Sequence, residues 1–312
     1  MYGYDNYQKV KAQIEKRRLD AIALADRRNL ELRAISEDIR IIDADLVKTG
    51  LRLFKAACEG QDITPIREEN LSLNRTRRAL LKSLGYPEDY TEPMYVCKKC
   101  SDSGFVGTAM CSCFREMLIK ENILSSGIGR LIERQSFDNF SLVGYEGEAR
   151  SIMEKNLAAA KDFAESFGKE NKNLLLIGPT GTGKTHISTS IAKVLIEKGV
   201  EVLYDSAQNI VSAFEKDKFR SGYGAYEPEG TKYLECELLI LDDLGTEFIS
   251  QFTVSCLYNL LNTRMNKGLA TIISTNLSPA ELSEKYEDRI YSRIVGQESR
   301  ILLFKGKDKR LG

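Results

Sequence analysis

The sequence predicts an α/β fold in its C-terminal part, with a five-stranded parallel sheet covered by helices on both faces. Five short apolar runs occur after about residue 130, and helix-length stretches separate them. The runs that we expect to form strands are residues 174–178, 200–205, 238–243, 270–275 and 300–304. A glycine-rich loop follows the first run directly, where such a domain turns from strand to helix. Because this alternation is typical of parallel sheets with helices on both faces, we expect residues 130–312 to form one domain.

The composition is that of an ordinary globular protein. Of 312 residues, 42% are hydrophobic and 29% are charged, which excludes the fibrous and intrinsically disordered classes. The 45 Lys and Arg residues balance 45 Asp and Glu residues, so a uniformly basic surface for nucleic acid is not expected. A local basic groove is compatible with this balance. Because a single core stops growing at about 250–300 residues, the length favours more than one domain.

Signals for compartment and membrane point to the cytoplasm. No apolar run approaches the roughly 18 residues of a membrane-spanning helix. The start, MYGYDNYQKVKAQ, has no apolar segment behind a basic end, so no secretory signal is expected. The odd number of cysteines, 7, favours a reducing compartment with metal-bound or free thiols over disulfides.

Residues 1–90 are predicted to form a highly charged helical region. Six apolar residues recur every three or four positions, as on one stripe of a helix. They are Leu32, Ile35, Ile39, Ile42, Leu46 and Leu53. Thr49 leaves one position of the stripe polar, and Gly50 suggests a break or kink. Thr64 is expected to cap a second helix, which has a proline in its first turn and ends near Gly85. The pattern fits both a bundle that packs on itself and a module that binds a partner.

Residues 91–125 contain four cysteines with the spacing C-x2-C-x10-C-x-C. They are Cys97, Cys100, Cys111 and Cys113. Zinc prefers four soft ligands in a tetrahedron, and two glycines between the pairs suit the tight turns of a ribbon-like hairpin. Four thiolates leave no position open for water, so the predicted zinc is structural, with free thiols as the alternative. Cys58, Cys236 and Cys256 lack this spacing and are expected to be small core residues.

The segment after the first expected strand is GPTGTGKT, a full match to the phosphate-binding pattern G-x4-G-K-[ST]. Its glycines allow backbone N–H groups to face phosphate oxygens at the positive start of a helix. Lys184 would then reach the β- and γ-phosphates, and the Thr185 hydroxyl would bind Mg²⁺. The residues predicted to bind ATP are Gly178, Pro179, Thr180, Gly181, Thr182, Gly183, Lys184, Thr185 and His186.

Polar side chains follow the third and fourth expected strands. Asp242 is expected to hold Mg²⁺ near the phosphate loop. Asp243 is the candidate base that orients the attacking water, and Glu247 is a second candidate. The fourth strand ends at Asn276, which would sense the γ-phosphate or position water. Its alternative role is to form a turn or cap before the helix that starts at Pro279.

Two arginines and one basic, aromatic segment complete the candidates. Arg289 and Arg293 lie four residues apart, where either could act on a neighbouring subunit's nucleotide or form ordinary surface pairs. The segment EKDKFRSGYGAYEPEGTKY mixes basic and aromatic side chains, which suits single-stranded DNA, with a plain surface loop as the alternative. Its candidates are Lys216, Lys218, Phe219, Arg220, Tyr223, Tyr226 and Tyr233.

The C-terminal part resembles the AAA+ ATPases of the bacterial helicase loaders, the DnaC/DnaI type, through GPTGTGKTH, LLILDDLGTE, the STN strand end and DRIYSRI. The same core occurs in the IstB-type ATPases that assist transposition. The resemblance covers the chain from about residue 130 to its end and implies a P-loop AAA+ (ASCE) fold. The cysteine module behind a helical region also resembles the DnaI-like loaders.

The resemblance implies a cytoplasmic ATPase that converts ATP and water to ADP and phosphate and uses hydrolysis as a switch. The N-terminal module would bind the replicative DNA helicase, and the ATPase domain would bind single-stranded DNA and self-associate. By position, Arg293 corresponds to the arginine finger that acts on the neighbouring subunit. Many related ATPases carry Glu where this chain has Asp243, which is one methylene shorter, so slow hydrolysis is expected.

Two alternatives stay open. An IstB-type transposition helper would share the ATPase core, whereas the cysteine module and the long helical region favour the loader. A P-loop small-molecule kinase would use the same phosphate loop, but the arginine pair and the STN strand end speak against it. The chain stops soon after its last expected strand, so the helical lid of larger AAA+ proteins is not expected. Arg300, Lys309 and Arg310 have no assigned role.

Overall fold

The computed structural model describes residues 4–169, 173–219, 228–296 and 299–309. The chain divides into two compact units, one of residues 1–10 and 116–312 and the other of residues 11–115. The finer division into residues 1–90, 91–125 and 130–312 stays a prediction. Among the described residues, none of the helices combines the length and the apolar character needed to cross a membrane.

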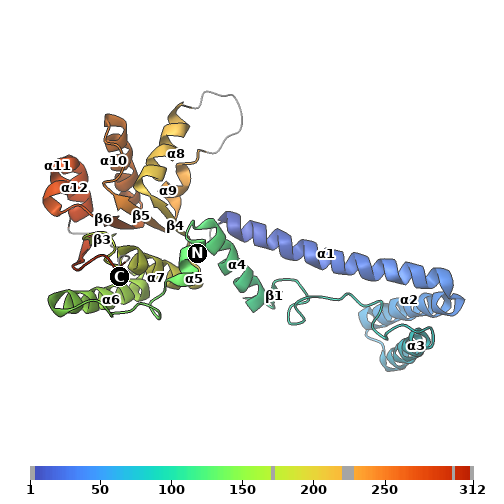
Figure 1. The fold of residues 1–312 in the computed structure, drawn as a ribbon. Helices are drawn as coiled ribbons and strands as arrows, with labels where there is room; N and C mark the ends of the chain where they lie inside the picture. Colours follow the sequence, from blue (N-terminus) through green and yellow to red (C-terminus); the bar gives the residue numbers. More distant parts are fainter. Residues whose placement is uncertain (1–3, 170–172, 220–227, 297–298, 310–312) are drawn as a thin grey trace. The chain divides into compact units, whose positions relative to one another are not determined.

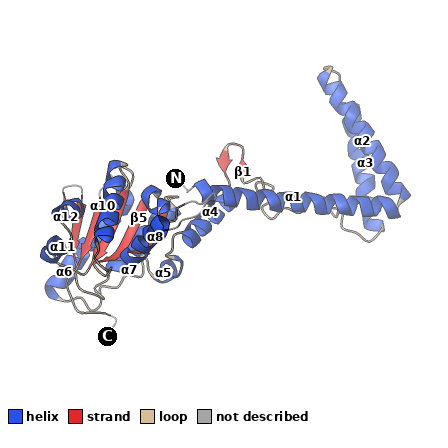
Figure 2. Cartoon of the chain, turned by 90° about the horizontal axis from the view of Figure 1, so that it is seen from above, coloured by secondary structure: helices blue, strands red, loops and turns tan. Residues whose placement is uncertain are grey.

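A five-stranded parallel sheet forms the centre of the larger unit (Figures 1 and 2). Its strands are β3 (Asn173–Ile177), β4 (Val202–Ser206), β5 (Leu238–Leu244), β6 (Ala270–Thr275) and β7 (Ser299–Leu303). Their order across the sheet is β4-β5-β6-β3-β7. All five expected strands are therefore present, and the predicted α/β fold is confirmed.

Helices cover both faces of the sheet, as Figure 1 shows. On one face lie α6 (Gly147–Ser166) and α7 (Lys184–Glu197), and on the other α8 (Ala207–Phe219), α10 (Gln251–Asn266) and α12 (Asp288–Val295). The shorter helices of this unit are α5 (Gly129–Arg134), α9 (Thr231–Glu235) and α11 (Pro279–Lys285). Leu174 and Leu176 contribute to the core under α7, whereas Leu175 and Ile177 contribute to the opposite core. The alternating side chains of β3 thus hold two hydrophobic layers together.

The carboxyl ends of the strands meet at one edge of the sheet. The register pairs Ser206 with Asp242 and Ile177 with Thr275, which brings the ends of β3, β4, β5 and β6 together. The pairing of β5 with β6 shifts after Leu241, and Asp243 has a φ of 53°. Ligands of open parallel sheets bind outside this edge.

The N-terminal helices are α1 (Tyr4–Ile35), α2 (Glu37–Cys58) and α3 (Thr64–Ser83). The expected break at Gly50 is wrong, because the chain leaves the helical path at Ser36 instead. Ser36 has extended φ and ψ angles, and its Oγ accepts a hydrogen bond from the Ile39 N–H group. A serine cap of this kind stabilises a new helix start. Ile35, expected on the apolar stripe, is exposed.

Thr49 is buried, although its place on the stripe is polar. Its Oγ1 donates to carbonyls of the preceding turn, including that of Asp45, and accepts a hydrogen bond from Asn70 Nδ2 over 2.8 Å. A second expectation about these helices is also wrong. Thr64 is the first residue of α3 and not its cap, and its N–H group donates to Asp62 Oδ1.

In the sequence, a short antiparallel hairpin of β1 (Phe105–Val106) and β2 (Ala109–Met110) comes between α3 and the next helix. Gly107 forms its turn with a φ of 60°, which favours glycine. The helix α4 (Ser112–Ser125) follows the hairpin. The ribbon-like hairpin expected from the two glycines is thus present.

Candidate nucleotide and metal sites

The phosphate loop connects β3 to α7 at the sheet edge described above. Gly183 precedes the helix with a φ of 93°, so the backbone conformation favours glycine there. A cavity of about 190 Å³ opens over the loop. It is lined by Gln135, Thr180, Gly181, Gly183, Lys184, Thr185, His186, Asp243, Thr246 and Asn276. Loop residues, Asp243 and Asn276 were predicted separately from three strand ends, and the structure brings them to one cavity.

The ammonium group of Lys184 is buried and held at the cavity. It donates to the carbonyl oxygens of Gly178 over 2.6 Å and of Pro179 over 2.9 Å. A third hydrogen bond of 2.6 Å runs to Asn276 Oδ1. Asn276 therefore joins the end of β6 to the phosphate loop through the lysine that was expected to reach the phosphates.

The carboxylate of Asp242 is buried beside the loop and receives three hydroxyl groups. Its Oδ1 accepts from Ser274 Oγ, and its Oδ2 accepts from the Tyr204 hydroxyl and, over 3.4 Å, from Thr185 Oγ1. Burial and the Asp242 carboxylate raise the pKa of Tyr204 well above its usual range, so its hydroxyl stays a donor. The Thr185 hydroxyl and the Asp242 carboxylate are the hard oxygen ligands that Mg²⁺ prefers, and their proximity fits a magnesium site.

The two candidate bases lie in different surroundings. Asp243 lines the cavity, and its N–H group donates to Ser274 Oγ over 3.0 Å. Glu247 is buried, and its oxygens accept hydrogen bonds from the Gly245 N–H group and the Tyr286 hydroxyl. The geometry favours Asp243 as the carboxylate that can reach a ligand, whereas Glu247 holds the backbone turn after β5.

His186 contacts the segment that precedes α6, which the sequence did not single out. Its Nε2 lies 3.1 Å from the carbonyl oxygen of Ser136 and 3.1 Å from Asn139 Oδ1. The Asn139 amide is oriented by its own bonds to Ser136 N and Arg134 O. Because both neighbours of Nε2 are acceptors, this nitrogen carries the proton. Burial lowers the pKa of His186, which favours the neutral ring.

Comparison with protein families assigns this domain. The model of the family described as IstB-like ATP-binding protein matches residues 139–305, which is more than half of the chain. The chain belongs to this family.

Among curated relatives, the ATP-binding domain is similar to the replicative helicase loader DnaC of Escherichia coli strain K12. The two are 26% identical over 180 residues, which span 58% of this chain and 71% of the loader. A putative ATP-binding protein of the insertion sequence IS232 from Bacillus thuringiensis subsp. berliner is 26% identical over 122 residues, 39% of this chain and 47% of that protein. The predicted resemblance to helicase loaders is confirmed.

Two solved structures are similar to part of this chain. A crystal structure of the DnaC helicase loader aligns with a TM-score of 0.48 and 21% identity, covering 56% of this chain and 99% of that one. A crystal structure of DnaI aligns with a TM-score of 0.46 and 25% identity, covering 58% of this chain and 93% of that one.

Arg293 of the ATP-binding domain is not among the residues that line the nucleotide cavity. Its guanidinium lies 4.4 Å from the centre of the Tyr258 ring and donates to Asn262 Oδ1 over 2.8 Å. It also donates to the carbonyl oxygen of Arg289 over 2.7 Å. Arg289 lines a separate cavity of about 570 Å³ with residues of α10, including Gln251. An action of either arginine on the nucleotide of its own chain is not supported by this geometry.

The basic, aromatic segment falls partly outside the described residues, because Arg220, Tyr223 and Tyr226 lie there. Phe219 is exposed, and the Lys218 ammonium lies 5.5 Å from the centre of its ring. Tyr233 is buried, and its hydroxyl donates to Asp205 over 2.7 Å. The expectation that Tyr233 stacks on DNA is therefore wrong, because this ring belongs to the core.

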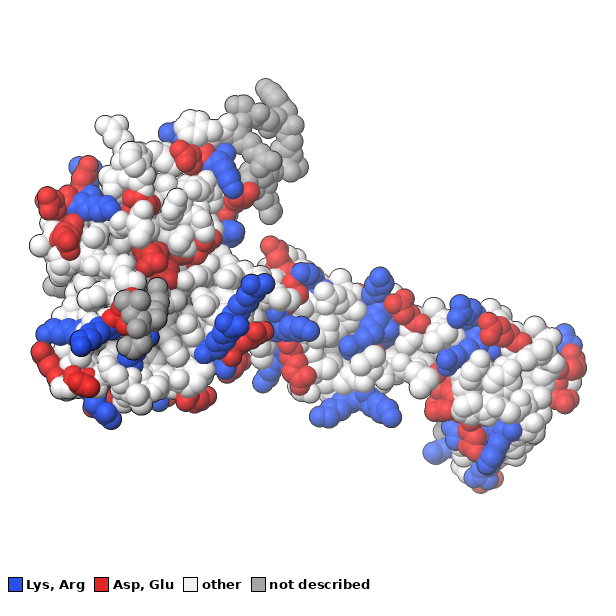
Figure 3. Space-filling model, in the orientation of Figure 1, with Lys and Arg blue, Asp and Glu red and all other residues white. Residues whose placement is uncertain are grey.

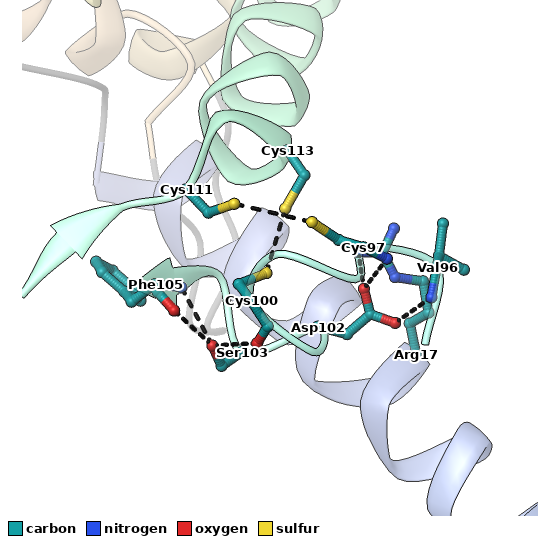
Figure 4. A network of polar contacts seen from close by, with 9 residues as sticks. All are labelled: Arg17, Val96, Cys97, Cys100, Asp102, Ser103, Phe105, Cys111 and Cys113. Atoms are coloured by element: carbon teal, nitrogen blue, oxygen red, sulfur yellow. Dashed lines mark hydrogen bonds and ion pairs between the residues drawn. The ribbon is translucent and has the colours of Figure 1, made fainter. Parts of the chain in front are cut away.

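The thiols of Cys97, Cys100, Cys111 and Cys113 converge, as Figure 4 shows, and their Sγ atoms all lie within 4.8 Å of one another. The Sγ atoms of Cys97 and Cys111 are 3.8 Å apart, and those of Cys100 and Cys113 are 3.6 Å apart. Four thiolates around zinc, at the usual Zn–S distance of about 2.3 Å, lie about 3.8 Å apart. The donor set and its spacing fit zinc.

An aspartate supports this cluster from outside. Asp102 accepts hydrogen bonds from the Cys97 N–H group over 2.9 Å and from the Val96 N–H group over 2.8 Å. Arg17 of α1 pairs with the same carboxylate at 2.6 Å (Figure 4). Hydrogen bonds from the Cys100 N–H group and the Cys113 thiol lower the pKa of the Cys97 thiol to about 7. Asp102 thus fixes the backbone that carries the first cysteine of the cluster.

Of the three cysteines outside the cluster, two are buried as predicted and one is not. Cys236 and Cys256 are buried, as expected, whereas Cys58 is exposed at the end of α2. The expectation that Cys58 is a core residue is wrong, because Cys58 is the last residue of α2 and is exposed, whereas Ala56 is the last buried residue of this helix.

Proposed function

We propose that this chain is an ATP-dependent helicase loader that acts in DNA replication in the cytoplasm. The observation that carries the proposal is the similarity to the replicative helicase loader DnaC over 71% of that protein's length. The alternative is an IstB-type transposition helper, which the shorter match to the IS232 protein favours. Both readings use the same ATP-binding domain and differ in the protein partner.

In the proposed reaction, ATP and water give ADP and phosphate. Mg²⁺, when bound, would neutralise charge on the phosphates, and Thr185 and Asp242 would hold it. Lys184 exchanges at least one of its protein acceptors for a phosphate oxygen, and the loop N–H groups bind further phosphate oxygens. Asp243 orients the attacking water from the cavity wall. Asn276, already bonded to Lys184, responds to the presence of a γ-phosphate.

Self-association would bring a further positive charge, that of an arginine, to the nucleotide of the neighbouring subunit. Arg293 is kept in one position by Tyr258 and Asn262, away from the nucleotide cavity of its own chain. An arginine that a neighbouring subunit contributes can stabilise the transition state of phosphoryl transfer. The proposal therefore assigns Arg293 to the nucleotide of the adjacent chain and makes hydrolysis depend on assembly. Single-stranded DNA is the proposed nucleic acid partner, with Lys216, Lys218 and Phe219 as contacts.

The N-terminal helices provide a surface for the helicase. Val47, Leu51 and Phe54 follow one stripe of α2 and are 59%, 67% and 72% exposed. On the face that Figure 3 shows, acidic and basic side chains are interspersed, so no single charge dominates there. Exposed apolar residues at helical spacing are typical of a face that packs against another protein. Zinc on the four cysteines would stabilise the adjoining hairpin.

A pull-down against the replicative helicase of the same organism tests the proposal. We expect the full chain to retain the helicase with ATP present and the variant with both Leu51→Asp and Phe54→Asp to lose it. Ile41→Asp is the matched control, because Ile41 is 52% exposed and points to another side of α2. Retention of a transposase instead of the helicase would establish the alternative, and no retention of the helicase by the wild type would refute the loader.

A further inference from the structure

Two carbonyl groups of the phosphate loop are held by residues outside the strand–loop–helix motif. The Tyr145 hydroxyl donates to the carbonyl oxygen of Thr182 over 3.0 Å. The N–H group of Lys309 donates to the carbonyl oxygen of Gly181 over 3.1 Å. Neither residue has a part in the function proposed above, and Lys309 lies beyond the segment that matches the family.

The two outside residues also contact each other. The Lys309 ammonium lies 3.3 Å from the centre of the Tyr145 ring, within the range of a cation–π interaction. It donates to the carbonyl oxygens of Ser141 over 3.1 Å and Val143 over 2.6 Å. Lys309 therefore fixes the segment that carries Tyr145, and Tyr145 is itself only 3% exposed. The two residues form one unit, which we name the loop clamp.

Two glycines of the loop lie close to the clamp and to Asp308, its neighbour in the sequence. A Cβ atom on Gly181 would lie 1.7 Å from Asp308 Oδ1, next to Lys309. A Cβ atom on Gly183 would lie 2.8 Å from the Tyr145 hydroxyl. Both glycines have positive φ angles as well. The positive φ angles favour glycine at both positions, and the short distance from Gly183 to the Tyr145 hydroxyl shows how near the clamp lies to the loop.

Holding the carbonyl groups on one side of the loop fixes the direction of the peptide N–H groups on the other. A row of N–H groups binds phosphate best when its conformation exists before the ligand arrives, since ordering it on binding costs free energy. We propose that Tyr145 and Lys309 are positioning residues for phosphate binding, which keep the phosphate loop in its binding conformation. This inference rests on the proposed function only in taking ATP and ADP as the ligands.

The test measures the affinity of the full chain for Mg-ADP and Mg-ATP by titration calorimetry. Tyr145→Phe removes the hydroxyl that binds the loop. Lys309→Ala keeps the backbone N–H group that binds Gly181 but removes the ammonium that holds Ser141, Val143 and the Tyr145 ring. Each variant should weaken the binding of both nucleotides about fivefold. Lys309→Arg should restore binding, because it keeps the charge and the donors. The exposed Lys307 supplies the matched control, and Lys307→Ala should bind like the wild type.

Two further readouts separate positioning from general stability. The double variant should lose less affinity than the product of the two single losses, because the residues form one unit. In urea unfolding without nucleotide, Tyr145→Phe should change the free energy of unfolding less than it changes the free energy of nucleotide binding. Unchanged affinities in Tyr145→Phe and Lys309→Ala, with a wild type that binds nucleotide, would overturn the loop clamp alone. A wild type that binds neither nucleotide, like Lys184→Ala, would overturn the proposed function and the clamp together.

Discussion

The ammonium group of Lys184 lies 2.6 Å from Asn276 Oδ1, so the key lysine of the phosphate loop is bonded to the end of the neighbouring strand β6. Its other two hydrogen bonds go to the carbonyl oxygens of Gly178 and Pro179. An ammonium group has three donors and no acceptor. A phosphate that binds Lys184 must therefore replace at least one of these acceptors. Asn276 is the one that can move away most easily, because it is a side chain and the other two acceptors are backbone carbonyls.

Replacing Asn276 with aspartate should weaken ATP more than ADP. The new carboxylate would form an ion pair with Lys184 and repel the γ-phosphate at short range. We expect a loss of about tenfold or more in ATP affinity and a smaller loss for ADP, both measured by calorimetry. Asn266→Asp, at the exposed end of α10, adds the same charge elsewhere. Equal affinities of wild type and Asn276→Asp for ATP would show that Asn276 does not face the γ-phosphate.

Removing the Tyr204 hydroxyl should weaken the magnesium site. Tyr204 donates to Asp242, and groups that orient metal ligands typically contribute about tenfold or more to metal affinity. In Tyr204→Phe we expect the Mg²⁺ concentration for half-maximal ATP binding to rise about tenfold. The ATP affinity measured in EDTA, without Mg²⁺, should equal that of the wild type. Tyr286→Phe is the control, because Tyr286 donates to Glu247 outside the cavity. An unchanged Mg²⁺ dependence in Tyr204→Phe would contradict this role.

The features that the sequence predicts correctly are those with a pattern in neighbouring residues. The strands and the phosphate loop are contiguous in sequence, so apolar runs and glycine spacing identified them. Tyr145, Lys309 and Tyr204 escaped because their contacts join distant segments. Tyr145 lies 37 positions from Thr182, and Lys309 lies 166 positions from Val143. A lone tyrosine or lysine carries no spacing signal, and only the folded sheet brings these side chains to the loop.

The errors in the helical region have the same origin. Gly50 suggested a break by its low helix propensity, but the surrounding α2 residues tolerate it and Ser36 provides the stronger local signal through its cap. The pattern alone makes Thr49 a polar gap in the stripe, because its partner Asn70 comes from another helix. Propensity is a weak guide where a tertiary hydrogen bond satisfies a buried hydroxyl.

Asp102→Asn should loosen the proposed zinc site. The carboxylate accepts hydrogen bonds from the N–H groups of Val96 and Cys97 and forms an ion pair with Arg17. It therefore orients the backbone at Cys97, the first cysteine of the cluster. An asparagine amide can replace only one acceptor oxygen, and we expect zinc affinity to fall about tenfold, measured by competition with a chelator. Asp20→Asn on the exposed side of α1 is the control. The same zinc content and chelator resistance in Asp102→Asn and wild type would contradict the orienting role.

Acid should destabilise the helical region through Asp43. Burial alone would raise the pKa of this carboxyl, but hydrogen bonds and charges of Arg77 and Arg33 outweigh it and hold the pKa below its usual value. Because the pKa is lower in the folded chain, the carboxylate stabilises the fold above the unfolded value of about 3.9. This stabilisation is lost as the pH falls through the folded value. Urea unfolding followed by helical circular dichroism should show the loss below about pH 4.

Asp43→Asn tests the same contribution at neutral pH. It leaves the buried arginine contacts without their charge partner, and breaking a buried ion pair of this kind costs on the order of 3 kcal/mol. We expect the free energy of unfolding of the helical region to fall by about 2–3 kcal/mol at pH 7, since Arg33 is partly exposed, and the acid dependence to become shallower. Asp45→Asn is the matched control, because Asp45 pairs with Lys48 on the exposed surface. An acid dependence in Asp43→Asn as steep as in the wild type would show that other carboxylates cause the acid effect.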